Sequence, residues 1–252
     1  MAQRKPLCCT GVASAVASLT VLAVGCSPTA PSPVGLTIGV SRTMLIVQET
    51  ATLSATLRLS NGQNTTVVPT WSIDDGKVGS VNDAGTLTAT APGTGTITAK
   101  YQGFTATQPV RVVPDYRGNW TGSARVSACS CSSACIPCGC RFALGASLPV
   151  VLTLSQTADQ VSGTFGWLEP FAVGPATGIV NADNRLILTA PVLIRPTFSA
   201  SYALTEWRST IDVAAGTMVG NFTVVTGVDP VAPGQCIVTN QNDLQVLKRT
   251  SQ

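Results

Sequence analysis

The strongest constraint on the fold is an alternation of apolar and polar residues that recurs along the chain. Every second position is apolar at Ala51, Leu53, Ala55, Leu57 and Leu59, and a β-strand would place all five side chains on one face. β-Branched residues are abundant and strong helix formers are scarce; glutamate, for example, occurs only at three positions. Both features favour strands over helices. The sequence therefore predicts an all-β protein.

Residues 1–25 have the layout of a secretory signal peptide. Arg4 and Lys5 supply positive charge, and an apolar run from Val12 to Val24 follows. That run is too short to cross a bilayer core of about 30 Å comfortably. Residues 26–34 are rich in Pro, Ser and Thr, which predicts an extended tether. The protein is therefore expected to be exported.

The end of this segment, Ala23-Val24-Gly25-Cys26, resembles the lipobox of bacterial lipoproteins, although Ala23 stands where leucine is usual. The resemblance implies that Cys26 is acylated and becomes the first residue of the mature chain. The membrane would then be a partner through an N-terminal lipid, and the expected location is the cell envelope, on the outer membrane or cell surface. The alternative is a plain secreted protein in which Cys26 has no special role.

About seven short strands separated by turn residues are expected between Leu36 and Val113, one of them over Val67–Ile73, and this number is typical of a sandwich. Four segments in this part resemble the bacterial immunoglobulin-like group 2 (BIG2) family: Ala51–Ala55, Trp71–Ser72, Val81–Ala89 and Pro92–Ala99. The resemblance covers residues 35–113 and implies an immunoglobulin-like surface module of the kind found in adhesins, many copies of which are spacers. Gly85 suits a turn position with positive φ, and Trp71 has the size to fill the gap between two sheets.

A second domain is expected over residues 115–252, after a linker at Pro114-Asp115-Tyr116. About eight predicted strands suit a closed antiparallel barrel or a two-sheet meander. Gly118-Asn119-Trp120 resembles the opening of lipocalin-like barrels, and Trp120 is interpreted as a core residue at the end of the barrel. Two similar phrases recur, Val161–Phe165 and Met218–Thr223. In each, glycine lets neighbouring strands bend and an aromatic side chain fills the core.

Six cysteines lie in this second domain. Five fall in or beside a loop predicted over residues 129–148, and one stands apart; they are Cys129, Cys131, Cys135, Cys138, Cys140 and Cys236. An even set in an exported chain favours disulfides. If the first and last strands of a barrel pair, Cys236 would bond to Cys129, or failing that to Cys131. Soft-metal binding by the thiolates is the first alternative, and a redox-active Cys135-x-x-Cys138 pair is the second.

Composition argues against most catalytic chemistry. The chain contains no histidine, which excludes Ser-His-Asp and Cys-His nucleophilic machinery and imidazole-ligated zinc. Asp74 and Asp75 are the only adjacent carboxylates and fall in a predicted turn. Glu169 and Glu206 lie beside tryptophans, as in some sugar sites, but strand ends explain that pattern as well. Without Arg4 and Lys5, the net charge of +3 falls to +1, too small to attract nucleic acid.

The sequence thus predicts a non-enzymatic, lipid-anchored envelope protein with a role in adhesion or scaffolding. No cofactor and no resident metal are predicted. Expected partners are the membrane and a protein or carbohydrate at the cell surface. An alternative function is binding of a small apolar ligand inside the barrel, because eight strands leave room either for packed side chains or for one small ligand.

Overall fold

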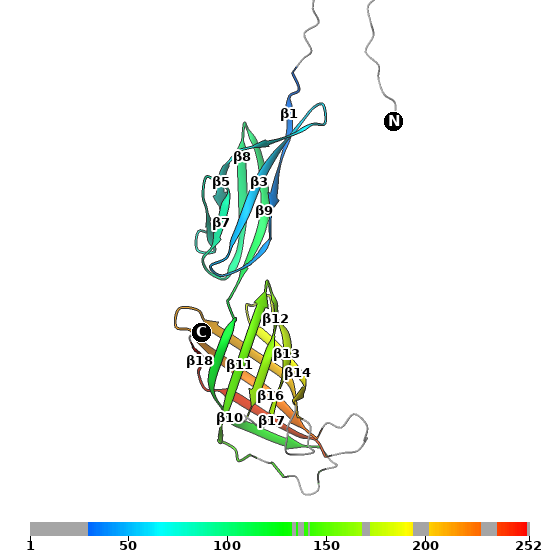
Figure 1. Cartoon of the computed structure of the whole chain (residues 1–252), viewed down its shortest axis with the longest axis vertical. Coiled ribbons are helices and arrows are strands. Elements are labelled where there is room, and N and C mark those ends of the chain that lie inside the picture. The colour runs from blue at the N-terminus through cyan, green and yellow to red at the C-terminus, as the bar shows by residue number, and fades with distance from the viewer. Residues whose placement is uncertain are drawn as a thin grey trace, which may run out of the picture.

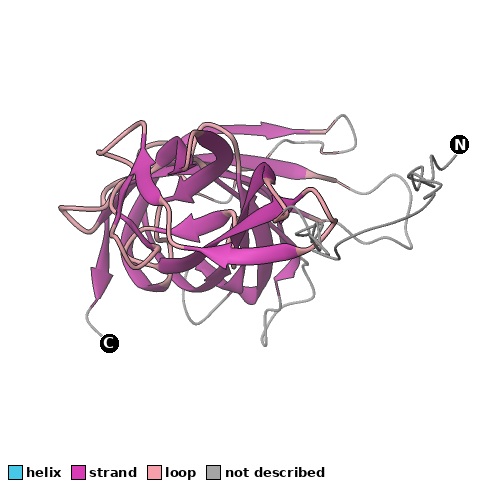
Figure 2. Cartoon of the chain, turned by 90° about the horizontal axis from the view of Figure 1, so that it is seen from above, coloured by secondary structure: helices cyan, strands magenta, loops and turns pink. Residues whose placement is uncertain are grey.

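The computed structural model describes residues 30–132, 135, 139–140, 142–167, 172–193, 202–227 and 236–250. Every regular element there is a β-strand (Figure 1, Figure 2), which confirms the predicted all-β class. The predicted signal peptide, Cys26 and the first residues of the tether lie outside these ranges. Within them, no helix has the length and apolar character that a bilayer crossing requires.

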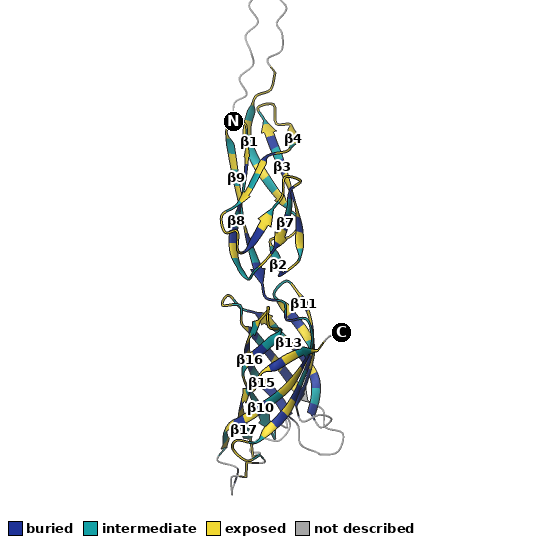
Figure 3. Cartoon of the chain, turned by 90° about the vertical axis from the view of Figure 1, so that its left-hand side faces the viewer, coloured by how far each residue is buried: buried dark blue, intermediate teal, exposed yellow. Residues whose placement is uncertain are grey.

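The N-terminal part is a sandwich of two sheets. The strands β1, β3, β7 and β6 adjoin in that order, with β4 beside β3, and β2, β9, β8 and β5 form the second sheet. The nine strands are β1 (Pro33–Val40), β2 (Met44–Ile46), β3 (Thr50–Leu59), β4 (Asn64–Val67), β5 (Thr70–Ile73), β6 (Gly79–Val81), β7 (Thr86–Ala89), β8 (Gly93–Tyr101) and β9 (Phe104–Val113). As the alternation predicts, β3 buries Ala51, Leu53, Ala55 and Leu57, and buried and exposed positions alternate along the strands (Figure 3).

Gly85 has the backbone conformation that the sequence predicts. Its φ is +77°, in the left-handed region that glycine adopts at low cost. The turn closes with a hydrogen bond from the Gly85 amide to the Asn82 carbonyl, 3.0 Å long, and Leu53 donates to the Gly85 carbonyl over 2.7 Å. A Cβ at this position would come within 2.9 Å of the Leu53 carbonyl oxygen. Glycine is therefore required both by conformation and by space.

Three expectations for this part of the chain need correction. The strand predicted over Val67–Ile73 is split between the two sheets, because Val67 ends β4 and the chain then crosses to β5. Pro69 lies at the crossing, where its missing N–H costs no ladder bond. Trp71 is consequently on an edge strand and only half-buried, so it packs against the rim of the core instead of filling the gap between the sheets. The tether is also shorter than predicted, since β1 begins at Pro33.

The C-terminal part is a closed, eight-stranded antiparallel barrel. Its strands are β10 (Gly118–Cys131), β11 (Ser147–Thr157), β12 (Gln160–Trp167), β13 (Ala172–Val180), β14 (Leu186–Leu193), β15 (Tyr202–Asp212), β16 (Thr217–Thr226), β17 (Val238–Leu244) and β18 (Leu247–Thr250). Both β17 and β18 pair with β10 and with β16, so they are two halves of one interrupted strand. The first and last strands therefore close the barrel, as predicted, and the meander alternative is excluded.

Aromatic side chains fill the barrel. Phe165, Phe222, Trp167, Trp207 and Tyr202 are each at most 1% exposed. They contact one another edge-on or stacked, with ring centroids from 5.3 Å for Trp207–Phe222 to 6.4 Å for Trp167–Phe222. Such pairs each contribute about 0.5–1.5 kcal/mol beyond the burial of their area. The barrel thus has a packed core around this aromatic cluster.

Close backbone approaches shape the barrel at three inward-facing glycines. A Cβ on Gly163 would overlap the Thr153 carbonyl oxygen of β11, and a Cβ on Gly178 would overlap the Ile187 carbonyl oxygen of β14. A Cβ on Gly220 would likewise overlap the Arg208 carbonyl oxygen of β15. In both repeated phrases the residue two positions after the glycine, Phe165 or Phe222, belongs to the aromatic cluster. The predicted role of the aromatic residue in these phrases is confirmed, and the glycine is needed for a close approach of the neighbouring strand.

Candidate functional site

Two places in the chain carry side-chain arrangements that go beyond ordinary strand packing. One is the joint between the sandwich and the barrel. The other is the cysteine-rich loop that follows β10 at the opposite end of the barrel (Figure 1).

The cores of the two domains are continuous through the joint. Ile46 and Val113, at the ends of β2 and β9, are 1% and 0% exposed and belong to the same buried cluster as the barrel residues. Met44 packs against that cluster as well. Because β2 and β9 run parallel side by side, they deliver these apolar side chains together to the end of the barrel. The sandwich therefore contributes to the hydrophobic core of its neighbour.

Tyr116 is the centre of the joint. Its side chain is fully buried, and its hydroxyl donates to the Asn184 carbonyl over 2.9 Å, with the Ser209 carbonyl 3.3 Å away. Burial raises the pKa of this hydroxyl, so it stays a neutral donor. The Tyr116 carbonyl in turn accepts from the indole of Trp120 over 2.9 Å, and Trp120 is fully buried at the end of the barrel, as expected.

One glutamine side chain holds the backbone of the linker. Gln156 is 8% exposed; its Oε1 accepts from the Tyr116 amide over 2.8 Å. Its Nε2 donates to the carbonyls of Pro114 and Ala158, over 3.0 and 2.9 Å. All of its hydrogen-bonding atoms are thereby used. The sequence predicts Pro114-Asp115-Tyr116 as a linker, and the structure corrects this interpretation: a side chain of β11 fixes it at both ends.

Charged side chains complete the joint. Arg117 donates from Nε to Asp115 Oδ1 over 2.8 Å, and its Nη1 lies 3.6 Å from Glu49 Oε1 of the sandwich. The hydrogen bond to Asp115 is the main cause of a raised pKa of Arg117. Arg249 donates to the Asp115 carbonyl and places its guanidinium 4.7 Å from the centroid of Trp120. A further bond between the domains runs from Arg111 to the Asn181 carbonyl.

These joint residues were not recognised from the sequence. A buried tyrosine, a glutamine forty positions later and an arginine near the C-terminus share no motif or spacing. The one available indication is the shortness of the segment between Val113 and the first barrel strand at Gly118. Such a short connection limits how far the two domains can move relative to each other.

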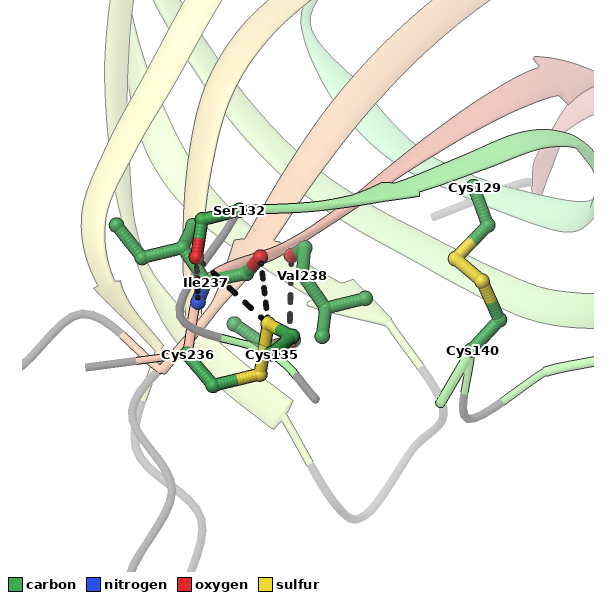
Figure 4. Close-up of a disulfide and its surroundings, with 8 residues drawn as sticks. Cys129, Ser132, Cys135, Cys140, Cys236, Ile237 and Val238 are labelled. Carbon is green, nitrogen blue, oxygen red and sulfur yellow. Dashed lines mark hydrogen bonds between the residues drawn. A yellow bond between two sulfur atoms is a disulfide. The ribbon is translucent and has the colours of Figure 1, made fainter. Parts of the chain in front are cut away.

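The cysteine-rich loop forms disulfides, but not in the predicted pairing (Figure 4). Cys129 is bonded to Cys140 and Cys135 to Cys236. Cys131 is also disulfide-bonded, and Cys138 lies outside the described residues. The expectation that Cys236 bonds to Cys129 or Cys131 is therefore wrong.

The register of the closing strands explains the error. A β-bulge after Val126 shifts the pairing of β10 with β17, so that Cys129 lies opposite Asn240 and Cys131 opposite Val238. Cys236 is four residues beyond Asn240, or about 13 Å along the strand, well outside the Cα separation of less than about 7 Å that a disulfide needs. The chain after β10 instead turns back at Ser132 and brings Cys135 to Cys236.

Main-chain and hydroxyl hydrogen bonds position that second disulfide. Ser132 donates its amide to the Ile237 carbonyl over 2.9 Å, and its Oγ accepts from the Ile237 amide over 3.0 Å. The Cys135 amide donates to the Ser132 carbonyl over 3.0 Å. Cys135 is only 7% exposed. This bond is therefore built into the end of the barrel and is not a loose surface link.

The carboxylates considered for catalysis have structural roles where they are described. Asp74 Oδ1 accepts from the Thr96 amide over 2.7 Å, and this hydrogen bond lowers the pKa of its carboxyl. A lowered pKa is the opposite of what a general acid requires. Glu206 pairs with Arg208 on the exposed side of β15, whereas Trp207 is buried in the aromatic cluster. Glu169 lies outside the described residues.

Comparison with known proteins supports the assignment of the sandwich. The family model described as bacterial Ig-like domain (group 2) matches residues 35–112. A search of curated proteins finds no match. The immunoglobulin-like fold of this part, followed by the closed barrel, is thus established by the family match and by the strand pairing.

Solved structures of a surface-layer protein align with the chain. Domains 5–6 of the S-layer protein SbsC are 16% identical, with 83% of this chain and 97% of that chain covered and a TM-score of 0.28. Domains 4–9 of the surface layer protein SbsC are 18% identical, with coverages of 82% and 31% and a TM-score of 0.29. The chain thus spans less than a third of that longer structure. TM-scores this low carry no argument about fold or function.

Proposed function

We propose that this protein is a non-catalytic cell-envelope scaffold, in which an immunoglobulin-like spacer holds a disulfide-bonded barrel at a fixed orientation and distance from a lipid anchor. The observation that carries the proposal is the shared core at the joint. Domains within one chain usually move relative to each other unless their interface is substantial and apolar. Here Ile46, Val113 and Tyr116 are buried in one cluster, which supports the proposal that the two domains behave as one stiff unit.

The chemistry of the described residues suits a structural role. The lumen is occupied by the aromatic cluster, several described carboxylates take part in turns and ion pairs, and the described cysteines are in disulfides. Binding of a small apolar ligand in the barrel stays a prediction, and the described aromatic rings occupy much of the interior that such a ligand would need. Adhesion to a protein or carbohydrate at the cell surface also stays a prediction, and the end of β10 that carries Cys129 and Cys131 lies at the end of the barrel away from the spacer (Figure 1).

A lipid on Cys26 would attach the scaffold to a membrane. It rests on the charged and apolar segment before Cys26 and on the lipobox resemblance at that cysteine. Acylation at Cys26 would leave only a few residues of tether before β1 begins at Pro33. The sandwich would therefore stand close to the membrane, with the barrel beyond it.

Lipid labelling tests this arrangement. Cells fed a labelled fatty acid should incorporate label into the wild-type protein and leave the Cys26→Ala protein unlabelled, because that thiol is the acceptor. The wild type should sediment with membranes, while Cys26→Ala should be released in soluble form. Cys8→Ala is the matched control and should label like the wild type, since Cys8 belongs to the segment that is removed. Equal label in Cys26→Ala and wild type would rule out the anchor.

A further inference from the structure

The turn between β15 and β16 has an apolar tip. Its residues are Val213, Ala214 and Ala215, at positions where turns usually carry glycine, asparagine, aspartate, serine or proline. Asp212 closes the turn, because its Oδ1 accepts from the Ala215 amide over 2.9 Å. All three residues of the tip are exposed, Val213 to 37%. The turn lies at the end of the barrel that faces the sandwich (Figure 1), so the tip adds apolar surface beside the joint.

Two clefts meet at this tip, and together they are called the joint cleft below. One has a volume of about 700 Å³ and is lined chiefly by apolar residues, among them Val47 and Pro92 of the sandwich. The other has a volume of about 760 Å³ and is lined by the linker and by the end of β18. Val213 and Ala214 line both. Sites for small molecules commonly have volumes of roughly 300–1,000 Å³ and often lie between domains, so the joint cleft has the size and the place of a ligand site.

Two guanidinium groups line the second of these clefts. Arg117 and Arg249 both approach Asp115. Asp115 Oδ1 accepts from Arg117 Nε over 2.8 Å, and Asp115 Oδ2 lies 3.6 Å from Arg249 Nη1. The side chains of the two arginines are 41% and 32% exposed, against 18% for Asp115. The two cations are therefore more accessible than the carboxylate that they share.

This ion-paired cluster has one positive charge in excess. Glu49 lies 3.3 Å from Arg42 and 3.6 Å from Arg117, so three arginines are paired with two carboxylates. The distance from Arg117 Nη1 to Glu49 Oε1 is too long for an ordinary hydrogen bond, which leaves that nitrogen able to bond a ligand. Guanidinium groups bind carboxylates through two parallel hydrogen bonds. One carboxylate on a ligand would therefore neutralise the cluster.

We propose that the joint cleft binds a small amphipathic carboxylate. Its acid group lies at Arg117 and Arg249, and its hydrocarbon body lies along Val213 and the apolar residues of the sandwich. The distribution of residues carries the proposal, since charge lies at one end of the cleft, apolar surface lies at the other, and the apolar tip joins them. Because both domains line the cleft, the bound molecule contacts the sandwich and the barrel together. This role is independent of a lipid on Cys26.

Titration with sodium decanoate tests the proposal, followed by NMR spectra of the soluble Cys26→Ala protein. Decanoate should bind at one equivalent and shift the amide signals of Val213 and Ala214 and the side-chain Nε signal of Arg117. Decanol lacks the charge and acetate lacks the apolar body, so each should bind at least about tenfold more weakly. Equal binding of decanoate and decanol would overturn the proposal, because the arginines would then have no role in it.

One substitution at each end of the cleft tests where decanoate lies. Arg117→Gln should weaken binding by about 10–100-fold, because it removes a charge-assisted hydrogen bond. Val213→Asp should weaken binding at least about tenfold, because a carboxylate replaces apolar surface and repels the ligand.

The matched control is Val219→Asp. Val219 is 46% exposed on β16 and lines neither cleft, so this variant should bind decanoate like the parent protein. The same NMR spectra show whether each variant is folded. Unchanged affinity in Arg117→Gln or Val213→Asp, or an equal loss in Val219→Asp, would show that decanoate does not occupy the joint cleft.

Discussion

Gly178→Ala is expected to destabilise the barrel by at least about 3 kcal/mol, the upper range for overpacking a well-packed interior. The new methyl group would overlap the Ile187 carbonyl oxygen of β14. That oxygen belongs to backbone in a hydrogen-bonded ladder, so it cannot rotate away as the end of a long side chain would. Relief requires β13 and β14 to separate, which opens the barrel. Urea denaturation followed by tryptophan fluorescence measures the change, because Trp167 and Trp207 are buried in the aromatic cluster.

The matched control is Gly139→Ala in the cysteine-rich loop of the same domain. A Cβ on Gly139 meets no atom within 4 Å, so the free energy of unfolding should change by no more than about 0.5 kcal/mol. Gly163→Ala should behave like Gly178→Ala, since its methyl would overlap the Thr153 carbonyl oxygen. A Gly178→Ala protein as stable as the control would mean that these close approaches do not shape the barrel.

The second large effect concerns the two described disulfides, which should differ in what they contribute. The Cys135–Cys236 bond spans 101 residues, and the Cys129–Cys140 bond spans 11. In the chain-entropy account, a cross-link stabilises by restricting the unfolded chain, and the effect grows with loop length. Replacing Cys135 and Cys236 together by serine should therefore cost about 4–5 kcal/mol, against about 3 kcal/mol for Cys129 and Cys140.

The same fluorescence-detected denaturation compares the two double variants under non-reducing conditions. Both cysteines of a bond are replaced together, so that no unpaired thiol remains to exchange with another disulfide. The ranking is the decisive result. If removal of the Cys129–Cys140 bond lowers the free energy of unfolding more than removal of the Cys135–Cys236 bond, then local packing at the rim contributes more to stability than loop closure does.

Local patterns in the sequence predict the elements well because their causes are local. The alternation from Ala51 to Leu57 depends only on the period of a strand, and Gly85 depends only on the turn that contains it. The phrase in which glycine is followed two positions later by phenylalanine is also local. It combines a close approach with an inward-facing ring, and the structure shows both at Gly163 and Phe165.

Contacts between distant segments were harder to predict. A bulge after Val126 is invisible in the sequence, yet it shifts the residue opposite Cys129 and Cys131 by one position on β17. The contacts of the joint also come from distant parts of the sequence. Tyr116 follows a proline like an ordinary linker residue, and only the folded structure shows that Gln156, Asn184 and Arg249 lie around the linker. A strand prediction across Val67–Ile73 fails for a related reason, since only the three-dimensional arrangement shows that the chain changes sheets at Pro69.

In the proposed scaffold, the joint between the sandwich and the barrel is stiff and fixes the position of the barrel relative to the sandwich. A rigid joint would make the position of the barrel depend on the sandwich alone, so that the far end of the barrel is held at a constant distance from the sandwich. Tyr116 matters most because it connects both kinds of contact, apolar burial and hydrogen bonds to two barrel carbonyls.

Residual dipolar couplings measured by NMR on the soluble Cys26→Ala protein, which lacks the lipid, test this claim most directly. If the joint is rigid, couplings from the sandwich and from the barrel fit one alignment tensor with the same magnitude and orientation. Adding Tyr116→Ala should break this agreement, because it removes the buried ring and its hydrogen bonds. Two different tensors in the protein with Tyr116 intact would show that the domains move independently and would contradict the proposed scaffold.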